Sequence, residues 1–153
     1  MAHEYHDRRR IEFADTDMAG IVHFANYFRY MEMAEHAFLR SLGLSVHQQA
    51  GDHAVGWPRI DAECSFKSAA TFEDELEIHL LVREKTAKTI GYAFRIRNGE
   101  GRPVAEGSIT VICVRFDPDT KQMAAITIPA DIDSAIDVAP AELLAGRPPG
   151  DGT

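Results

Sequence analysis

The chain has 153 residues, of which 45% are hydrophobic and 26% charged, and this composition excludes a fibrous repeat or a largely disordered chain. Its formal net charge of −8 argues against nonspecific nucleic-acid binding, which depends on neutralising phosphates, so no nucleic-acid partner is expected. No apolar run approaches the roughly 18 residues that a membrane helix needs, and the first residues lack a secretory apolar stretch. A cytoplasmic protein with no membrane partner is therefore expected.

Two cysteines, Cys64 and Cys113, occur in strand-like segments, and neither has a CxxC partner. This usage favours free thiols over a disulfide framework or a metal site. No metal is predicted.

In the first half of the chain, the spacing of hydrophobic residues changes from the alternation typical of a strand to the three- and four-residue steps typical of a helix. Alternation over residues 6–14 predicts a half-buried strand, and the turn-forming residues 15–20 break it. A long helix should follow directly and end at Gly43. Its apolar face is expected to carry Phe24, Tyr27, Phe28, Met31, Ala34, Phe38 and Leu42, and its polar face Arg29, Glu32, His36 and Arg40.

The second half is predicted to be mostly strand. Residues 44–58 carry two glycines and a proline and indicate a flexible loop. Strands are expected over residues 59–66, 75–84, 89–97 and 104–116, the last three as an antiparallel meander, with a short helix between residues 129 and 144. A sheet that curls around the helix buries both apolar faces, which predicts an α+β fold. We expect one domain over residues 1–146 and a disordered tail over 147–153.

The stretch IEFADTDMAGIVHFANY, residues 11–27, resembles the opening motif of the 4-hydroxybenzoyl-CoA thioesterase family, including its YbgC-like acyl-CoA thioesterase branch. It joins a strand end, a DxD turn, an Ala-Gly pair and an Asn-Tyr pair in the family's order. The segment FKSAATFED, residues 66–74, resembles the family's second-strand entry. The resemblance spans residues 6–128 and implies a hot-dog fold, in which an antiparallel sheet wraps one long central helix. It also implies a homodimer joined sheet edge to sheet edge, or a homotetramer, with active sites at the dimer interface.

The same resemblance implies hydrolysis of an acyl-CoA thioester to a free acid and coenzyme A, with no cofactor because coenzyme A is part of the substrate. Asp17 matches the family's catalytic carboxylate and would attack the thioester carbon or activate a water. The first N–H groups of a helix are unpaired and lie at the positive end of its dipole, so they can polarise the carbonyl. The donor would be the amide near Phe24, assisted by turn amides such as that of Gly20, whereas Asp15 is given a structural role.

The remaining motif residues are expected to position the substrate or the oxyanion. Asn26 should fix the start of the helix, and Tyr27 completes the Asn-Tyr pair. Many YbgC-like members carry a Tyr-His pair where this chain has His23-Phe24, so the histidine is displaced by one position. One residue turns a helix by about 100°, so His23 cannot simply inherit that role. Phe24 instead favours aromatic or bulky acyl groups.

Several alternatives stay open at the level of sequence. Glu32 or Glu35 would be the catalytic carboxylate if the chain followed the hot-dog branch that takes it from the central helix, although Glu32 and His36 also form an i, i+4 pair typical of a helix surface. A hot-dog hydratase or dehydratase and a non-catalytic acyl-CoA-binding protein are the alternative functions. The candidates for contacts with the coenzyme A phosphates are Arg59, Lys67, Arg83, Lys85, Lys88 and Arg102.

Overall fold

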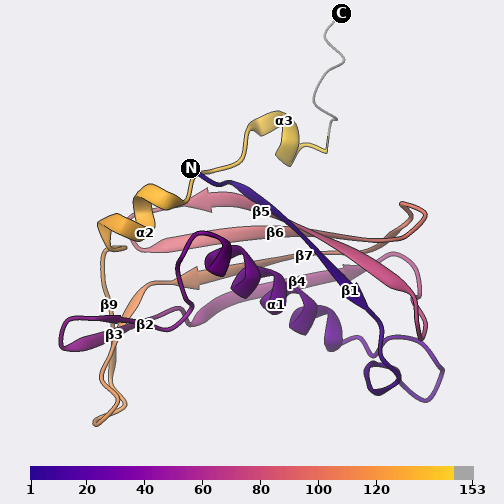
Figure 1. Cartoon of the computed structure of the whole chain (residues 1–153), viewed down its shortest axis with the longest axis horizontal. Helices are drawn as coiled ribbons and strands as arrows, with labels where there is room; N and C mark the ends of the chain where they lie inside the picture. The colour runs from indigo at the N-terminus through magenta and orange to yellow at the C-terminus, as the bar shows by residue number, and fades with distance from the viewer. Residues whose placement is uncertain (147–153) are drawn as a thin grey trace, which may run out of the picture.

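The computed structural model describes residues 1–146, so the predicted disordered tail, residues 147–153, lies outside the described residues. A five-stranded antiparallel sheet has the order β1-β5-β6-β7-β4, and the helix α1 (Asn26–Ser41) lies across one of its faces (Figure 1). The strands are β1 (Glu4–Arg10), β4 (Arg59–Phe66), β5 (Glu75–Lys85), β6 (Thr89–Asn98) and β7 (Pro103–Ile112). The predicted meander is confirmed by the pairing of β5 with β6 and of β6 with β7. The predicted α+β hot-dog architecture is confirmed as well.

The core lies between α1 and the sheet. The helix buries one face, whose residues are spaced three or four positions apart and include Tyr27, Met31, Ala34 and Phe38. Alternate residues of β5 and β6 face it and are buried: Leu76, Ile78, Leu80, Val82, Ile90, Tyr92, Phe94 and Ile96. The period of two in the strands and the period near 3.6 in the helix thus place both apolar faces in one core.

A second, smaller sheet was not predicted. Residues 44–58 were expected to be a flexible loop, but they contain β2 (Gln48–Ala50) and β3 (His53–Gly56), which pair as a hairpin. β3 also pairs with β8 (Val114–Phe116), which in turn pairs with β9 (Met123–Ala125). The strand expected over residues 104–116 is therefore two strands, because the chain leaves the large sheet after Ile112 and enters the small one at Val114.

The connection from β1 to α1 also differs from the prediction. The strand ends at Arg10, a short 3-10 helix η1 (Phe13–Asp15) follows, and α1 begins only at Asn26. The helix starts late because Ile21 and Val22 form bridges with Thr71 and Thr16, which keep this stretch extended. Phe24 consequently precedes the helix.

The C-terminal part of the described chain holds α2 (Ala130–Ala135) and α3 (Ala141–Leu144), where one short helix was expected. A parallel bridge joins Ala2 to Ile136, and the Ala139 N–H donates to the Val82 carbonyl oxygen (2.9 Å). This segment therefore covers the start of β1 and part of β5. None of the helices in residues 1–146 is long and apolar enough to cross a lipid bilayer.

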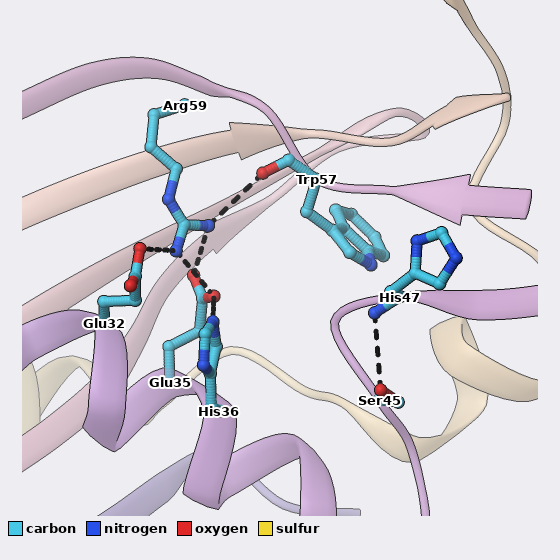
Figure 2. Close-up of polar contacts among 7 residues, drawn as sticks. All are labelled: Glu32, Glu35, His36, Ser45, His47, Trp57 and Arg59. Carbon is cyan, nitrogen blue, oxygen red and sulfur yellow. Dashed lines mark hydrogen bonds and ion pairs between the residues drawn. The ribbon is translucent and has the colours of Figure 1, made fainter. Parts of the chain in front are cut away.

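One ion pair ties the middle of α1 to the start of β4 (Figure 2). The Glu35 carboxylate is 1% exposed and accepts two hydrogen bonds from the Arg59 guanidinium, at 2.9 and 3.0 Å. The same guanidinium donates to Glu32 (3.4 Å) and to the Trp57 carbonyl oxygen (3.3 Å). Burial raises the pKa of Glu35 above its ordinary value of 4.5, although Arg59 acts in the opposite direction.

At Gly107 of β7 the end of the Met31 side chain of α1 lies where a Cβ would be. A Cβ at this position would overlap the end of the Met31 side chain and would lie 2.7 Å from the Glu63 carbonyl oxygen of β4. Gly107→Ala should therefore lower the free energy of unfolding by about 1–3 kcal/mol, measured by urea denaturation. The control is Gly99→Ala, where a Cβ meets no atom within 4 Å. Equal stability of the two variants would contradict a tight contact at Gly107.

The Glu35 pair has a consequence for the pH dependence of stability. Because the pKa is raised in the fold, folded Glu35 binds a proton more tightly than the unfolded chain does. The stabilisation that protonated Glu35 gives the fold is fully present below 4.5, the pKa of this carboxyl in the unfolded chain. It is lost as the pH rises through the higher pKa of Glu35 in the folded protein. Urea denaturation between about pH 4 and pH 8 should show the wild type losing stability relative to Glu35→Gln as the pH rises.

Glu32→Gln is the matched control for this pH series, since Glu32 contacts the same guanidinium from the exposed side of the helix. The difference in free energy of unfolding between Glu32→Gln and the wild type should change little with pH. If the free energy of unfolding of the wild type instead rises relative to that of Glu35→Gln as the pH increases, the attraction of Arg59 outweighs the cost of burying the carboxylate.

Candidate active site

A tight turn between η1 and α1 fixes the position of Asp17. The Asp17 N–H donates to the Ile21 carbonyl oxygen (2.8 Å), and the Gly20 N–H donates to the Asp17 carbonyl oxygen (3.0 Å). Gly20 has φ +81°, a left-handed conformation that glycine adopts without steric cost. The Asp17 carboxylate accepts the Ala19 N–H at Oδ1 (2.8 Å). The half-buried carboxylate is thus held by its own turn and keeps its second oxygen available.

Asp15 and Asn26 hold this turn against the start of the helix. The Asp15 carbonyl oxygen accepts the His23 N–H (2.9 Å) and the Asn26 side-chain amide (2.8 Å). The Asp15 carboxylate accepts the Glu12 N–H (3.0 Å) and closes a capping box on η1. The side chains of Asp15 and Asn26 therefore both form hydrogen bonds with backbone groups.

A pocket of about 290 Å³ opens beside Asp17. The turn and the helix start supply Asp17, Phe24 and Tyr27 to its wall, and residues 66–69, at the end of β4 and just beyond, supply the opposite side. The Val22 N–H donates to the Ala70 carbonyl oxygen (2.9 Å) and holds the two segments together. The predicted turn motif and the predicted second segment, far apart in sequence, thus line one cavity.

Aromatic rings form most of the apolar wall. The Phe66 ring lies edge-on to Phe24, with ring centroids 6.4 Å apart, and tilted against Tyr27 at 5.6 Å. Tyr27 is 4% exposed, and burial raises the pKa of its hydroxyl to about 12, so the phenol stays protonated near neutral pH. The pocket therefore presents a carboxylate on an otherwise largely apolar surface.

Backbone N–H groups accompany the carboxylate. The Ala25 N–H donates to His23 Nδ1 (3.2 Å), the Asn26 N–H to the His23 carbonyl oxygen (2.9 Å) and the Tyr27 N–H to the Phe24 carbonyl oxygen (3.4 Å). The Phe24 N–H, in contrast, has no acceptor among residues 1–146. An N–H without an internal acceptor at a helix start is suited to bind an oxyanion.

The predicted site residues therefore fall into three groups. Asp17, Phe24 and Tyr27 line the pocket. Gly20 and Asn26 shape the turn and the helix start. His23 is exposed, stacks on the Phe24 ring with centroids 4.7 Å apart and does not line the pocket. Their catalytic roles stay predictions.

The alternative carboxylates lie elsewhere. Glu35 is engaged with Arg59 inside the fold, and neither it nor Glu32 lines the pocket beside Asp17. The sequence pattern did not reveal the partnership with Arg59, which begins β4 and had been considered for contacts with coenzyme A. The pair joins residues 24 positions apart, so no local spacing could have indicated it.

A larger hollow of about 420 Å³ lies at the edge formed by β1, β5 and β6. Its charged lining includes Arg8 and Glu75, which pair at 3.4 Å, together with Glu77 and Arg97. It contains no residue of the predicted motif. Size alone therefore does not identify the active site, and the smaller pocket is the one lined by Asp17 and by Phe24, whose N–H has no acceptor among residues 1–146.

Comparisons with known proteins agree with the predicted family. The family model of the thioesterase-like superfamily matches residues 11–136. A 4-hydroxybenzoyl-CoA thioesterase from Pseudomonas sp. (strain CBS-3) is 31% identical over 140 residues, covering 86% of this chain and 96% of that protein. A 1,4-dihydroxy-2-naphthoyl-CoA hydrolase from Thermosynechococcus vestitus is 25% identical over 128 residues, covering 84% and 88% of the two chains.

A solved structure, that of a gentisyl-coenzyme A thioesterase, superposes with a TM-score of 0.74 at 30% identity and covers 86% of this chain and 98% of that one. The sequence and structure comparisons thus each cover more than four fifths of the chain. The chain belongs to the thioesterase-like superfamily, which confirms the predicted relationship to the 4-hydroxybenzoyl-CoA thioesterases.

Proposed function

We propose that the protein hydrolyses acyl-CoA thioesters and that Asp17 is its catalytic carboxylate. The observation that carries the proposal is the pocket lined by both Asp17 and Phe24, whose backbone N–H has no acceptor within the described residues. Thioester hydrolysis needs these two groups: a carboxylate at the carbon and a hydrogen-bond donor at the carbonyl oxygen. The relatives named above carry thioesterase and CoA hydrolase names, which supports the same chemistry here.

Two routes use this geometry equally well. In the first, an Asp17 oxygen attacks the thioester carbon, the C–S bond breaks, coenzyme A leaves, and water hydrolyses the resulting mixed anhydride. In the second, Asp17 takes a proton from a water that attacks the same carbon, after which the C–S bond breaks and coenzyme A leaves as the thiol with that proton. In both routes the negative charge on the carbonyl oxygen would be stabilised by the Phe24 N–H. Neither route needs a cofactor beyond the substrate itself.

The preferred substrate is proposed to carry an aromatic acyl group. Phe24, Tyr27 and Phe66 surround the carboxylate and offer ring faces and edges to a planar group. A volume of about 290 Å³ lies at the low end of the range of about 300–1,000 Å³ for small-molecule sites, so it suits an acyl group and not a whole coenzyme A. Relatives named for hydroxybenzoyl, gentisyl and dihydroxynaphthoyl thioesters support this choice.

Coenzyme A would then extend from the pocket across the surface. Lys67 borders the pocket and is the cation best placed to meet it. Arg59 is held by Glu35, and Lys85 donates to the Asp133 and Ile136 carbonyl oxygens at 3.0 and 2.8 Å. Those two cations are therefore less suited to bind phosphate. Both cysteines are free thiols in this structure, which is compatible with a reducing compartment and with the proposed cytoplasmic location.

The active form is proposed to be a homodimer joined through β4, which two such dimers can extend to a homotetramer. β4 is an edge strand of the large sheet, and an edge leaves backbone groups available for pairing. Ile60 and Phe66 of β4 are 56% and 52% exposed, and Phe24, whose ring lies against that of Phe66, is 62% exposed. Pairing at this edge would cover apolar side chains next to the pocket.

The catalytic role of Asp17 is tested by Asp17→Asn, which keeps the shape of the side chain and an acceptor for the Ala19 N–H. Thiol release should fall by at least about 10²-fold, because a major catalytic group is lost, while binding of the acyl-CoA changes little. The substrates are benzoyl-CoA, hydroxybenzoyl-CoA, straight-chain acyl-CoAs of increasing length and one unsaturated acyl-CoA. Free thiol is followed with a chromogenic disulfide.

Asp119→Asn is the matched control, since Asp119 is an exposed turn residue between β8 and β9 and should leave turnover unchanged. Full turnover in Asp17→Asn together with loss in Glu32→Gln or Glu35→Gln would transfer the role to the helix. Binding across the panel with no thiol release by the wild type would favour an acyl-CoA-binding protein. Hydration of the unsaturated substrate alone would favour a hydratase.

The proposed dimer is tested by Ile60→Glu, which places a charge at the edge strand. Sedimentation should show the wild type as a dimer or tetramer and the variant shifted toward monomer, with a parallel loss of turnover. Met123→Glu is the control, because Met123 of β9 is similarly exposed (59%) but lies in the small sheet. A fully active monomeric wild type would rule the proposed interface out.

A further inference from the structure

A cluster of histidines and a carboxylate lies where β1 pairs with β5, apart from the pocket beside Asp17. His6 and His79 are direct cross-strand partners in the antiparallel register. Glu4 lies two residues before His6, so strand alternation places both side chains on one face of the sheet. Tyr5, between them, points to the other face and contacts Phe38 of α1. The cluster is therefore on the face of the sheet that α1 does not cover.

The distances within this cluster are those of groups that can share one ion. His79 Nε2 lies 2.7 Å from Glu4 Oε2, and His6 Nε2 lies 3.8 Å from the same oxygen. One ring nitrogen of each histidine and one carboxylate oxygen all lie within 4.8 Å of one another. Zinc binds histidine nitrogen and carboxylate oxygen at about 2.0–2.2 Å, so tetrahedral ligand atoms lie about 3.4 Å apart. The two nitrogen–oxygen distances in the cluster, 2.7 and 3.8 Å, lie on both sides of this value.

A second carboxylate supports the arrangement. His6 Nδ1 lies 3.3 Å from Glu77 Oε1, on the same strand as His79. A carboxylate on the far nitrogen of a metal-bound histidine fixes the tautomer and the ring orientation and leaves Nε2 as the ligand. His3 Nε2 lies 3.9 Å from the other Glu4 oxygen and stands outside this group of three.

The ring geometry defines the movement that binding requires. The His6 and His79 rings are stacked with centroids 4.0 Å apart and planes 11° apart, so their Nε2 lone pairs do not yet converge. His6 has the freedom to tilt because its side chain is 55% exposed, whereas His79 is 15% exposed and held by the fold. A rotation of the exposed ring alone brings the two nitrogens toward a common point.

Two arginines on the strands around the cluster hydrogen-bond to other groups. Arg95 of β6 is opposite His79 in register, but its guanidinium donates to the Leu143 and Leu144 carbonyl oxygens at 2.8 and 2.7 Å. Arg8, further along β1, pairs with Glu75 at 3.4 Å. Both cations have partners of their own.

We propose that Glu4, His6 and His79 form a binding site for a zinc ion that clips β1 to β5. Two imidazoles and one carboxylate are a donor set that zinc accepts, with a water as the fourth ligand. The site is structural and independent of the thioester chemistry, since none of its residues lines the pocket beside Asp17. It would fix the edge strand β1 to its neighbour β5 in the large sheet.

The test is calorimetric titration of the full-length protein, freed of metal with a chelator, with zinc chloride. The wild type should bind one zinc ion per chain, and His6→Ala/His79→Ala should bind it at least about 100-fold more weakly, because two of three ligands are lost. At about 100 times the dissociation constant, zinc should raise the Tm of the wild type by about 5–10 °C and leave that of the double variant unchanged.

His47→Ala/His53→Ala removes the same number of histidines from the small-sheet region and should bind zinc like the wild type. Glu4→Gln retains both rings and should still weaken binding, which keeps the proposal testable if the double variant fails to fold. Absence of stoichiometric binding by the wild type, or equal binding by the wild type and Glu4→Gln, would overturn the site. Thioesterase activity plays no part in these readouts.

Discussion

The burial of one helix face against one sheet face is the constraint on which the other features of the molecule depend. α1 and the large sheet each present an apolar surface that water disfavours, and neither has another place to bury it within residues 1–146. Once α1 lies across the sheet, the chain must pass from the end of β1 to the start of α1 within the 15 residues from Ile11 to Ala25. Within that passage the chain makes a tight turn at residues 17–21. The turn carries Asp17, and Phe24 follows it just before the helix, so both residues line one pocket.

The length of the connection also explains why the site is built from backbone as much as from side chains. Asp17, Gly20 and Ile21 close the turn on itself, and Val22 then reaches the segment beyond β4 through the Ala70 carbonyl oxygen. These bonds keep residues 21 and 22 extended and delay the helix to Asn26. A helix that began directly after Gly20 would place the Phe24 N–H inside its first turns. The delay therefore leaves that N–H outside the helix and without an acceptor among residues 1–146.

The sequence predicted the parts of the fold that have a long, regular period. Strand β4 was predicted with its observed bounds, and β5 and β6 to within a residue, because eight or more residues follow one alternation. The small sheet was missed because its strands have three or four residues, too few to show a period. β3 finds its partner β8 about 60 residues away, a contact that no local pattern encodes. The turn motif could be predicted because its residues are contiguous, whereas Arg59 as the partner of Glu35 and the cross-strand pair of His6 and His79 depend on tertiary register.

The exposure of the pocket wall links the proposed chemistry to the proposed assembly. Phe24 and Phe66 are more than half exposed, although both line the cavity that holds the carboxylate. Hydrogen bonds to a developing oxyanion are worth far more where water is excluded, and an open apolar wall does not exclude it. A neighbouring subunit at the β4 edge would cover these rings and lower the local dielectric around Asp17 and the Phe24 N–H together. In that arrangement the protomer supplies the reacting groups, and the dimer supplies the dry environment in which they act.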